Sequence, residues 1–210
     1  MNHDILLKKI HLYGVRGLPL SWIRSYLKDR QSFIKLGTAT SENKTINIGI
    51  PQGSIIGPLL FLIFINDLPN VSNMFQTCLF AHDTTLSAKD KDFSVLIQNT
   101  NIELEKIQDW TISNRLSINV DKTELIIFSN RRHGIDTLTN LANLNGDVLE
   151  YSDSCKFLGV FIDKDLTFVQ HINDIVGKLS RGTGILYNIR SKLSVEARIN
   201  YYHGMLYPYI

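Results

Sequence analysis

Cysteine is scarce in this 210-residue sequence: only Cys78 and Cys155 occur, and they lie far apart. A disulfide scaffold or a zinc module needs more cysteines or a closer ligand spacing, so neither is expected. An excess of one charge is also lacking, because 22 Lys and Arg residues stand against 20 Asp and Glu residues, a formal net charge of +2. This balance excludes a broadly basic nucleic-acid coat, and any such binding must use a local patch.

Long apolar runs are absent as well. The most apolar window, residues 55–65, contains Gly57 and Pro58 and is shorter than the roughly 20 residues that a membrane span needs, so it predicts a buried helix. The first five residues lack a basic segment leading into an apolar run, so no secretory signal is expected. Together with the scarcity of cysteine, these features predict an intracellular protein that is neither secreted nor membrane-bound, in the nucleus or the cytoplasm.

The composition, 44% hydrophobic and 20% charged, is that of a folded protein. Apolar spacing of the helical kind and of the strand kind both occur, which predicts an α+β fold. Helices are expected over residues 3–12, 19–29, 55–68 and 93–110, and from 170 onward. Strands are expected over residues 33–36, 45–48, 75–81, 84–88, 116–120, 125–128, 141–149 and 157–162, with a turn at 41–43.

Two short stretches carry candidate chemistry. In the turn of residues 49–54, Pro51 and Gly53 allow the backbone to approach a flat or phosphorylated ligand closely, and Gln52 offers a donor and an acceptor. The alternative is an ordinary strand-to-helix turn. In the second stretch, Asp83 lies at a turn between two apolar strands, where a carboxylate can be aimed at a hard cation. The alternative is a plain turn residue.

Taken together, "GIPQGSIIGPLLFLIFINDLP" and "CLFAHDTTL" resemble the palm of reverse transcriptases, specifically those of non-LTR retrotransposons of the jockey/CR1 type. Three further segments resemble the family in the same order: "WTISNRLSINVDKTELIIF", "CKFLGVFIDKDLTFVQHI" at the primer grip, and "LYNIRSKLSVEARINYYHGMLYPYI" at the start of the thumb. The resemblance covers essentially the whole chain. It implies a right-hand polymerase palm, an antiparallel sheet backed by helices, over residues 1–165. A partial helical thumb is expected over residues 166–210, with the fingers missing.

The resemblance also implies a chemistry. Family members extend a DNA primer on an RNA template by two-metal transfer from a deoxynucleotide, with no other small-molecule cofactor, and two Mg²⁺ ions require a cluster of carboxylates. The family supplies an Asp from an earlier palm segment and an Asp pair at the hairpin tip. By the same resemblance, Lys122 is the general acid for the leaving group, and Pro51, Gln52 and Gly53 line the template and the new base pair.

This sequence departs from the family twice. The tip expected as Ala-Asp-Asp reads Ala81-His82-Asp83, which replaces a carboxylate by imidazole at a catalytic position. The chain also begins after the segment that carries the other catalytic Asp in the family. Asp83 is therefore the one metal ligand expected from the acidic trio, and the chain is expected to be inactive as written. Asp67 and Asp121 match no catalytic position and are interpreted as helix-end and turn residues.

Three functions remain open from the sequence. The chain is a polymerase that acts only when missing parts are supplied, a non-catalytic nucleic-acid-binding remnant, or a pseudogene product without a selected role. Template-dependent synthesis separates the first from the other two, and salt-dependent affinity for a primer–template separates the second from the third. The oligomeric state is left open.

Overall fold

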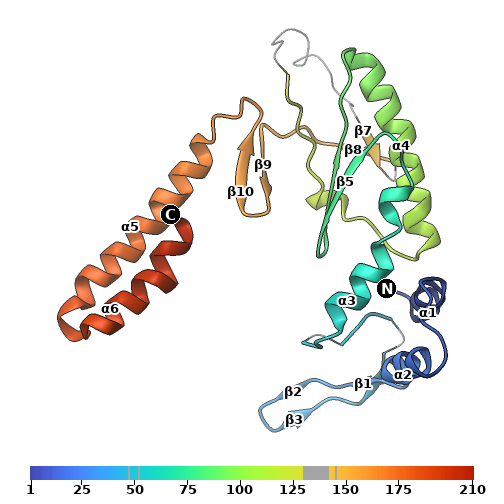
Figure 1. The fold of residues 1–210 in the computed structure, drawn as a ribbon, viewed down its shortest axis with the longest axis horizontal. Helices are drawn as coiled ribbons and strands as arrows, with labels where there is room; N and C mark the ends of the chain where they lie inside the picture. The colour runs from blue at the N-terminus through green and yellow to red at the C-terminus, as the bar shows by residue number, and fades with distance from the viewer. Residues whose placement is uncertain (47, 52, 130–141, 145) are drawn as a thin grey trace. The chain divides into compact units, whose positions relative to one another are not determined.

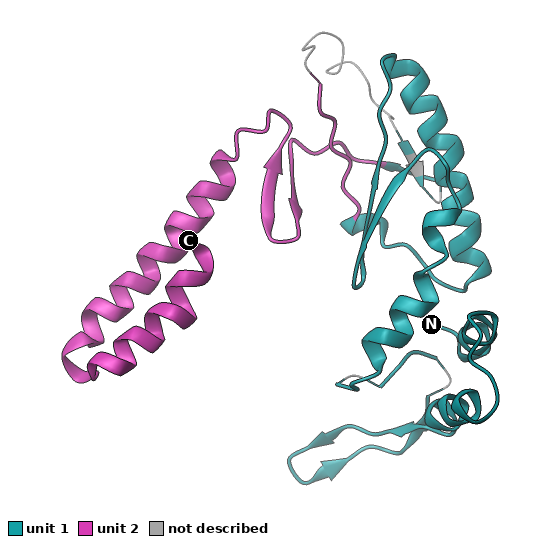
Figure 2. Ribbon diagram, in the orientation of Figure 1, with its two compact units in different colours: residues 1–122, 140–148 teal, residues 123–139, 149–210 magenta. Residues whose placement is uncertain are grey.

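The structure is a computed structural model that describes residues 1–46, 48–51, 53–129, 142–144 and 146–210. It contains helices and small antiparallel sheets, as the predicted α+β class requires (Figure 1). The chain divides into two compact units (Figure 2). The first comprises residues 1–122 and 140–148 and the second residues 123–139 and 149–210, each as far as it is described. The predicted boundary at residue 165 concerns the family's palm and thumb and stays a prediction.

The core of the first unit forms where three helices meet. They are α1 (His3–Leu12), α2 (Leu18–Leu27) and α3 (Gly57–Ile65). Helix α1 begins where predicted because the Asn2 side chain accepts hydrogen bonds from the backbone N–H groups of its first turn. Helix α1 packs on both α2 and α3. The buried residues of this core are Leu6, Ile10, Leu27, Leu60, Phe64 and Ile65.

A β-hairpin, called the ribbon below, follows α2, and each of its two arms contains two short strands. Its strands are β1 (Gln31–Ser32), β2 (Lys35–Leu36), β3 (Ala39–Thr40) and β4 (Lys44–Thr45), with β1 paired to β4 and β2 to β3. The sequence prediction placed the turn at residues 41–43, which is wrong. The chain reverses at Gly37 instead, where φ is +60°, a value that glycine adopts without steric cost.

The rest of the first unit contains a hairpin, a long helix and a second strand pair. These elements are η1 (Leu68–Asn70), β5 (Gln76–Phe80), β6 (Asp83–Ser87), α4 (Phe93–Ser113), η2 (Val120–Lys122), β7 (Ala142–Leu144) and β8 (Asp147–Leu149). Strand β5 pairs with β6, and α4 packs on β7. The predicted strands at 75–81 and 84–88 and the helix from residue 93 are thus confirmed.

The strands predicted at residues 116–120 and 125–128 do not form. Residues 116–119 adopt no regular structure, and Leu125 makes only an isolated bridge with Tyr151. Apolar alternation indicates a strand, but a strand also needs a neighbour that takes its backbone N–H and C=O groups. Each sheet in the described part of the chain has two strands, and none of them pairs with these segments.

The second unit contains a hairpin and a pair of helices. Its elements are β9 (Ser154–Phe157), β10 (Val160–Asp163), α5 (Val169–Ile189), η3 (Arg190–Lys192), α6 (Val195–Tyr201), η4 (Tyr202–Leu206) and η5 (Tyr207–Tyr209). The chain returns along α5 and contacts it at Gly182, where Leu206 is buried and the Tyr201 hydroxyl donates a hydrogen bond to the Gly182 carbonyl over 3.0 Å. Among the described helices, none has the length and apolar character of a membrane span.

Candidate active site

The hairpin of β5 and β6 presents the residues that the sequence selected as catalytic. Phe80 pairs with Asp83, which leaves Ala81 and His82 as a two-residue loop. Ala81 adopts a φ of +49°, as the first loop residue of a primed hairpin turn must, although glycine is preferred there. This turn places Asp83 as the first residue of β6, at the end of a two-stranded antiparallel hairpin.

Both side chains at the tip face solvent. The His82 side chain is 86% exposed and the Asp83 side chain 65%, and His82 Nε2 lies 3.7 Å from Asp83 Oδ1. That separation is too long for a hydrogen bond, and an exposed pair of this kind contributes little to stability. The tip therefore offers one carboxylate beside one imidazole.

The donors at the tip do not fit a pair of Mg²⁺ ions. Mg²⁺ takes oxygen ligands in near-octahedral geometry, and imidazole suits softer metals. Within the described part of the chain, no three His, Cys, Asp or Glu side chains gather where a metal ion could be held. Asp83 is thus a lone candidate metal ligand, and no reaction step through magnesium follows from this arrangement.

The turn of residues 49–54 is held by segments far away in the sequence. The Gly49 N–H donates to the Met1 carbonyl over 2.8 Å, and His3 Nε2 lies 2.7 Å from the Gly49 carbonyl oxygen. At the other end of the turn, the Tyr26 hydroxyl donates to Ser54 Oγ. Sequence reasoning missed all three supports, because no local pattern links residues that are 28 to 48 positions apart.

Glycine is favoured at Gly53 within this turn and at Gly57, the first residue of α3. Gly53 has a φ of +76°, where a Cβ would be strained, and a Cβ on Gly57 would lie 3.3 Å from Ile50 Cγ2. The Ser54 N–H donates to the Pro51 carbonyl over 3.3 Å and closes the turn before α3. Gln52 lies outside the described residues. Pro51 and Gly53 thus occupy a tight turn that leads directly into the core helix.

Helix α3 is fixed in turn by a lysine that sequence reasoning missed. Lys9 of α1 is 9% exposed, and its Nζ donates to the Phe64 carbonyl over 2.7 Å and to Asp67 Oδ1 over 2.6 Å. The same Nζ lies 4.8 Å from the ring centroids of Phe64 and Trp110. Asp67 directly precedes η1, so its interpretation as a helix-end residue is confirmed. The burial of Lys9 could have been found from its spacing, because Lys9 lies about one helical turn after Leu6 and so shares the buried face of α1.

Lys122 is the last residue of η2 and is exposed. Its backbone N–H donates to the Asn119 carbonyl over 3.2 Å. No hydrogen bond or ion pair in the described residues joins Lys122 to Asp83. The structure therefore shows no direct bond between these two predicted residues, and the role of Lys122 stays a prediction.

Comparison with known proteins decides the family. A family model described as reverse transcriptase (RNA-dependent DNA polymerase) matches residues 1–162. The chain belongs to the reverse transcriptase family. The match includes the hairpin tip and the turn of residues 49–54, on which the resemblance rested.

Several curated relatives match over most of the chain. The RNA-directed DNA polymerases from mobile element jockey of Drosophila melanogaster and Drosophila funebris are 27% and 29% identical, each over 89% of this chain. The probable RNA-directed DNA polymerase from transposon X-element of Drosophila melanogaster is 26% identical, also over 89%. The resemblance to jockey-type non-LTR retrotransposons is thereby confirmed. The chain spans only 21% of the length of each of these relatives.

Proposed function

We propose that the chain is the palm of a jockey-type reverse transcriptase, residues 1–165, with the start of its thumb, residues 166–210. We infer that these 210 residues do not synthesise DNA by themselves. The observation that carries this proposal is the pairing of one carboxylate, Asp83, with the imidazole of His82 at an exposed hairpin tip. The family relationship supports the polymerase ancestry, and the donor set argues against catalysis.

Coulomb's law gives the size of the repulsion between two metal ions at the tip. Two divalent cations about 4 Å apart repel by about 16 kcal/mol at an effective dielectric constant of about 20, four times the value for unit charges. Two Mg²⁺ ions carry four positive charges and one carboxylate offsets one of them, so the ions would keep a net charge of about +3 after losing part of their hydration water. Further carboxylates are needed to offset that charge. A single Asp83 does not supply them.

A primer-extension assay tests the proposal. The purified chain is incubated with an RNA template, a DNA primer, deoxynucleotides and either Mg²⁺ or Mn²⁺, beside the variant Asp83→Ala. Incorporation is expected to be the same for both proteins and equal to background. Template-dependent incorporation that is lost in Asp83→Ala contradicts the inactivity.

The variant His82→Asp tests the same reasoning from the other side. It creates the Asp pair of the family at the tip, but no third acid lies there among the described residues. No gain of incorporation is expected from this change alone. Activity restored by His82→Asp would mean that two carboxylates suffice.

A second candidate function is nucleic-acid binding without catalysis. It is supported by the turn of residues 49–54, because Met1, His3 and Tyr26 hold that turn through hydrogen bonds that do not involve Asp83 or His82. Binding of a labelled RNA–DNA primer–template is expected to weaken as salt rises.

The variant Gly53→Val tests whether the turn contributes to that binding. It is expected to weaken binding, because a β-branched residue is strained at a φ of +76°. Gly37→Val is the matched control, since Gly37 also has a positive φ but lies in the ribbon. Equal effects of the two variants, or no salt-dependent binding at all, would favour an unselected product.

A further inference from the structure

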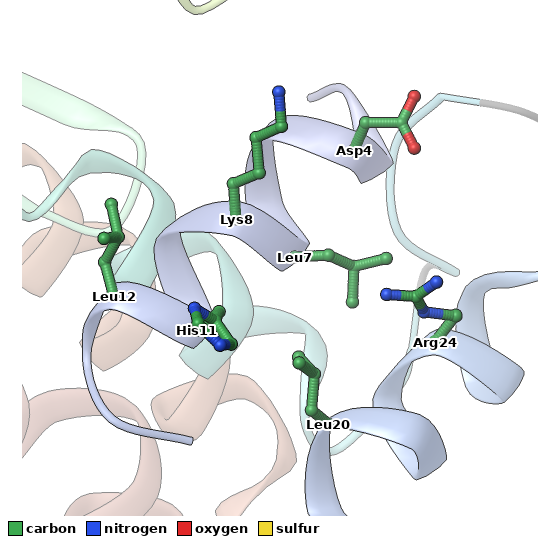
Figure 3. Close-up of a pocket in the computed structure, with 7 residues that line it drawn as sticks. All are labelled: Asp4, Leu7, Lys8, His11, Leu12, Leu20 and Arg24. Atoms are coloured by element: carbon green, nitrogen blue, oxygen red, sulfur yellow. The ribbon is translucent and has the colours of Figure 1, made fainter. Parts of the chain in front are cut away.

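A groove of about 590 Å³ lies between helices α1 and α2 of the first unit. Its floor contains Leu7 from α1 and Leu20 from α2, and both side chains point into the space between the two helices (Figure 3). Leu12 adds to the lining at the end of α1 and is 82% exposed. The floor of the groove is therefore made of leucine, and no Phe, Tyr or Trp side chain belongs to the lining.

The rim of the groove is predominantly basic. Lys8 lies on α1 and Arg24 on α2, so a cation stands on each side, and Arg24 turns toward Leu7 (Figure 3). His11 also lines the groove, and Asp4 is its one acidic residue. In the described part of the chain, neither Lys8 nor Arg24 forms an ion pair, so both charges are available to a ligand.

The two walls are held rigidly from behind. On its opposite face α1 buries Leu6 and Ile10, which are 0% and 1% exposed, in the core of the first unit. Leu27 of α2 lies in the same core at 2% exposure. A groove between two anchored helices is preformed, and a ligand that enters it does not have to order its walls.

We propose that this groove binds an amphipathic helix of a partner protein, with leucine-type residues on its inner face and acidic residues along both sides. Such helices place apolar residues at positions i, i+3, i+4 and i+7 into an apolar groove. Acidic residues beside that stripe match the cations of Lys8 and Arg24. A single-stranded nucleic acid fits less well, because its bases are held by stacking on aromatic side chains and the lining offers only the imidazole of His11. The proposal does not depend on polymerase activity or on the turn of residues 49–54.

A binding experiment with a synthetic peptide tests this site. The probe is a fluorescent helical peptide with leucine at those four positions and glutamate on both sides, and its anisotropy is measured during titration with the full chain. Two further peptides replace glutamate by lysine and leucine by glutamine. The first peptide is expected to bind, and each altered peptide about tenfold more weakly or not at all.

The double variant Lys8→Glu with Arg24→Glu locates the binding. It is expected to weaken the first peptide at least about tenfold and to improve the lysine peptide, because the rim changes sign. The matched control is Lys35→Glu with Lys44→Glu, which makes the same change in net charge on the exposed ribbon. That control is expected to bind like the unchanged chain, and circular dichroism checks that both variants are folded.

Four results would overturn the proposal. The first three are no binding of the first peptide, equal binding of the glutamate and lysine peptides, and equal weakening by the groove variant and the ribbon control. The fourth is a loss of primer–template affinity in the groove variant with no change in peptide binding, which would assign the groove to nucleic acid. The primer–template assay of the turn variants is separate, so failure here leaves the proposed function standing.

Discussion

The ion pair of Lys9 and Asp67 gives the sharpest prediction about stability. Its two side chains are unequally buried: that of Lys9 is 11% exposed and that of Asp67 is 41% exposed. Removing Asp67 leaves a buried ammonium with only the Phe64 carbonyl and two aromatic rings around it. Removing Lys9 leaves a carboxylate that water can reach.

The magnitudes follow from this asymmetry. Breaking a fully buried pair costs about 3–5 kcal/mol, and breaking an exposed one about 0–1 kcal/mol. We expect Asp67→Ala to lower the free energy of unfolding by about 3 kcal/mol, because the buried partner is orphaned. Lys9→Met keeps the packing on Phe64 and Trp110, so a loss of about 1–1.5 kcal/mol is expected, mainly for the hydrogen bond to the Phe64 carbonyl.

The double variant Lys9→Met with Asp67→Ala tests whether the orphaned ammonium causes the loss of stability. With Lys9→Met present, no buried charge remains, so adding Asp67→Ala should cost less than it does alone. The double variant is therefore expected to be more stable than Asp67→Ala by about 1–2 kcal/mol. Urea unfolding followed by circular dichroism measures all four proteins.

Asp153→Ala is the matched control. It breaks the ion pair of Asp153 with Lys164, whose N–O distance is 2.7 Å but whose side chains are 72% and 40% exposed. A much smaller change is expected there. Equal effects of Asp67→Ala and Asp153→Ala, or a double variant less stable than Asp67→Ala, would refute the reasoning from burial.

Three further predictions concern local geometry and pH. Arg115 follows the C-cap residue Asn114 of α4 and has a φ of +53°, so Arg115→Gly should raise the free energy of unfolding by about 0.5–1 kcal/mol in urea unfolding. A Cβ on Gly182 would lie 2.6 Å from Leu206 Cδ2, whereas one on Gly184 would meet nothing within 4 Å. Gly182→Ala should therefore be about 1–3 kcal/mol less stable than Gly184→Ala, and equal melting temperatures would contradict this. The Thr167 backbone N–H that donates to Asp163 lowers the pKa of this carboxyl below its usual 3.8, so its stabilising contribution is present above that pH and is lost as the pH falls through the lowered pKa. Acid titration of Asp163→Asn should show a shallower loss of stability than the unchanged chain.

Elements with strong local signals could be predicted from the sequence. Helix α1 has the predicted bounds because Asn2 caps it, and the β5–β6 hairpin follows the apolar strands around Asp83. Helix α3 is expected from residue 55 but begins at Gly57. The Gly57 N–H donates to the carbonyl oxygen and to Oγ of Ser54, so the preceding residues still form a turn.

The errors have a common physical origin in partners that are distant in sequence. Residues 116–120 show a strand pattern but have no strand to pair with in the described chain. Lys9 has the residue type of a surface position, yet Asp67 and the Phe64 carbonyl allow its burial. For the candidate site, the chemistry of Asp83 and His82 could be deduced from their identities. The supports of the turn at residues 49–54 could not, because they come from Met1, His3 and Tyr26.

The most direct test of the central claim measures nucleotide addition by the unchanged chain. A single-turnover assay with saturating protein, RNA template and labelled primer detects addition of even one nucleotide in the presence of Mg²⁺. The lone Asp83 predicts that the primer stays at its original length. A primer lengthened by the unchanged chain but not by Asp83→Ala would contradict the claim that one carboxylate beside His82 cannot support the reaction.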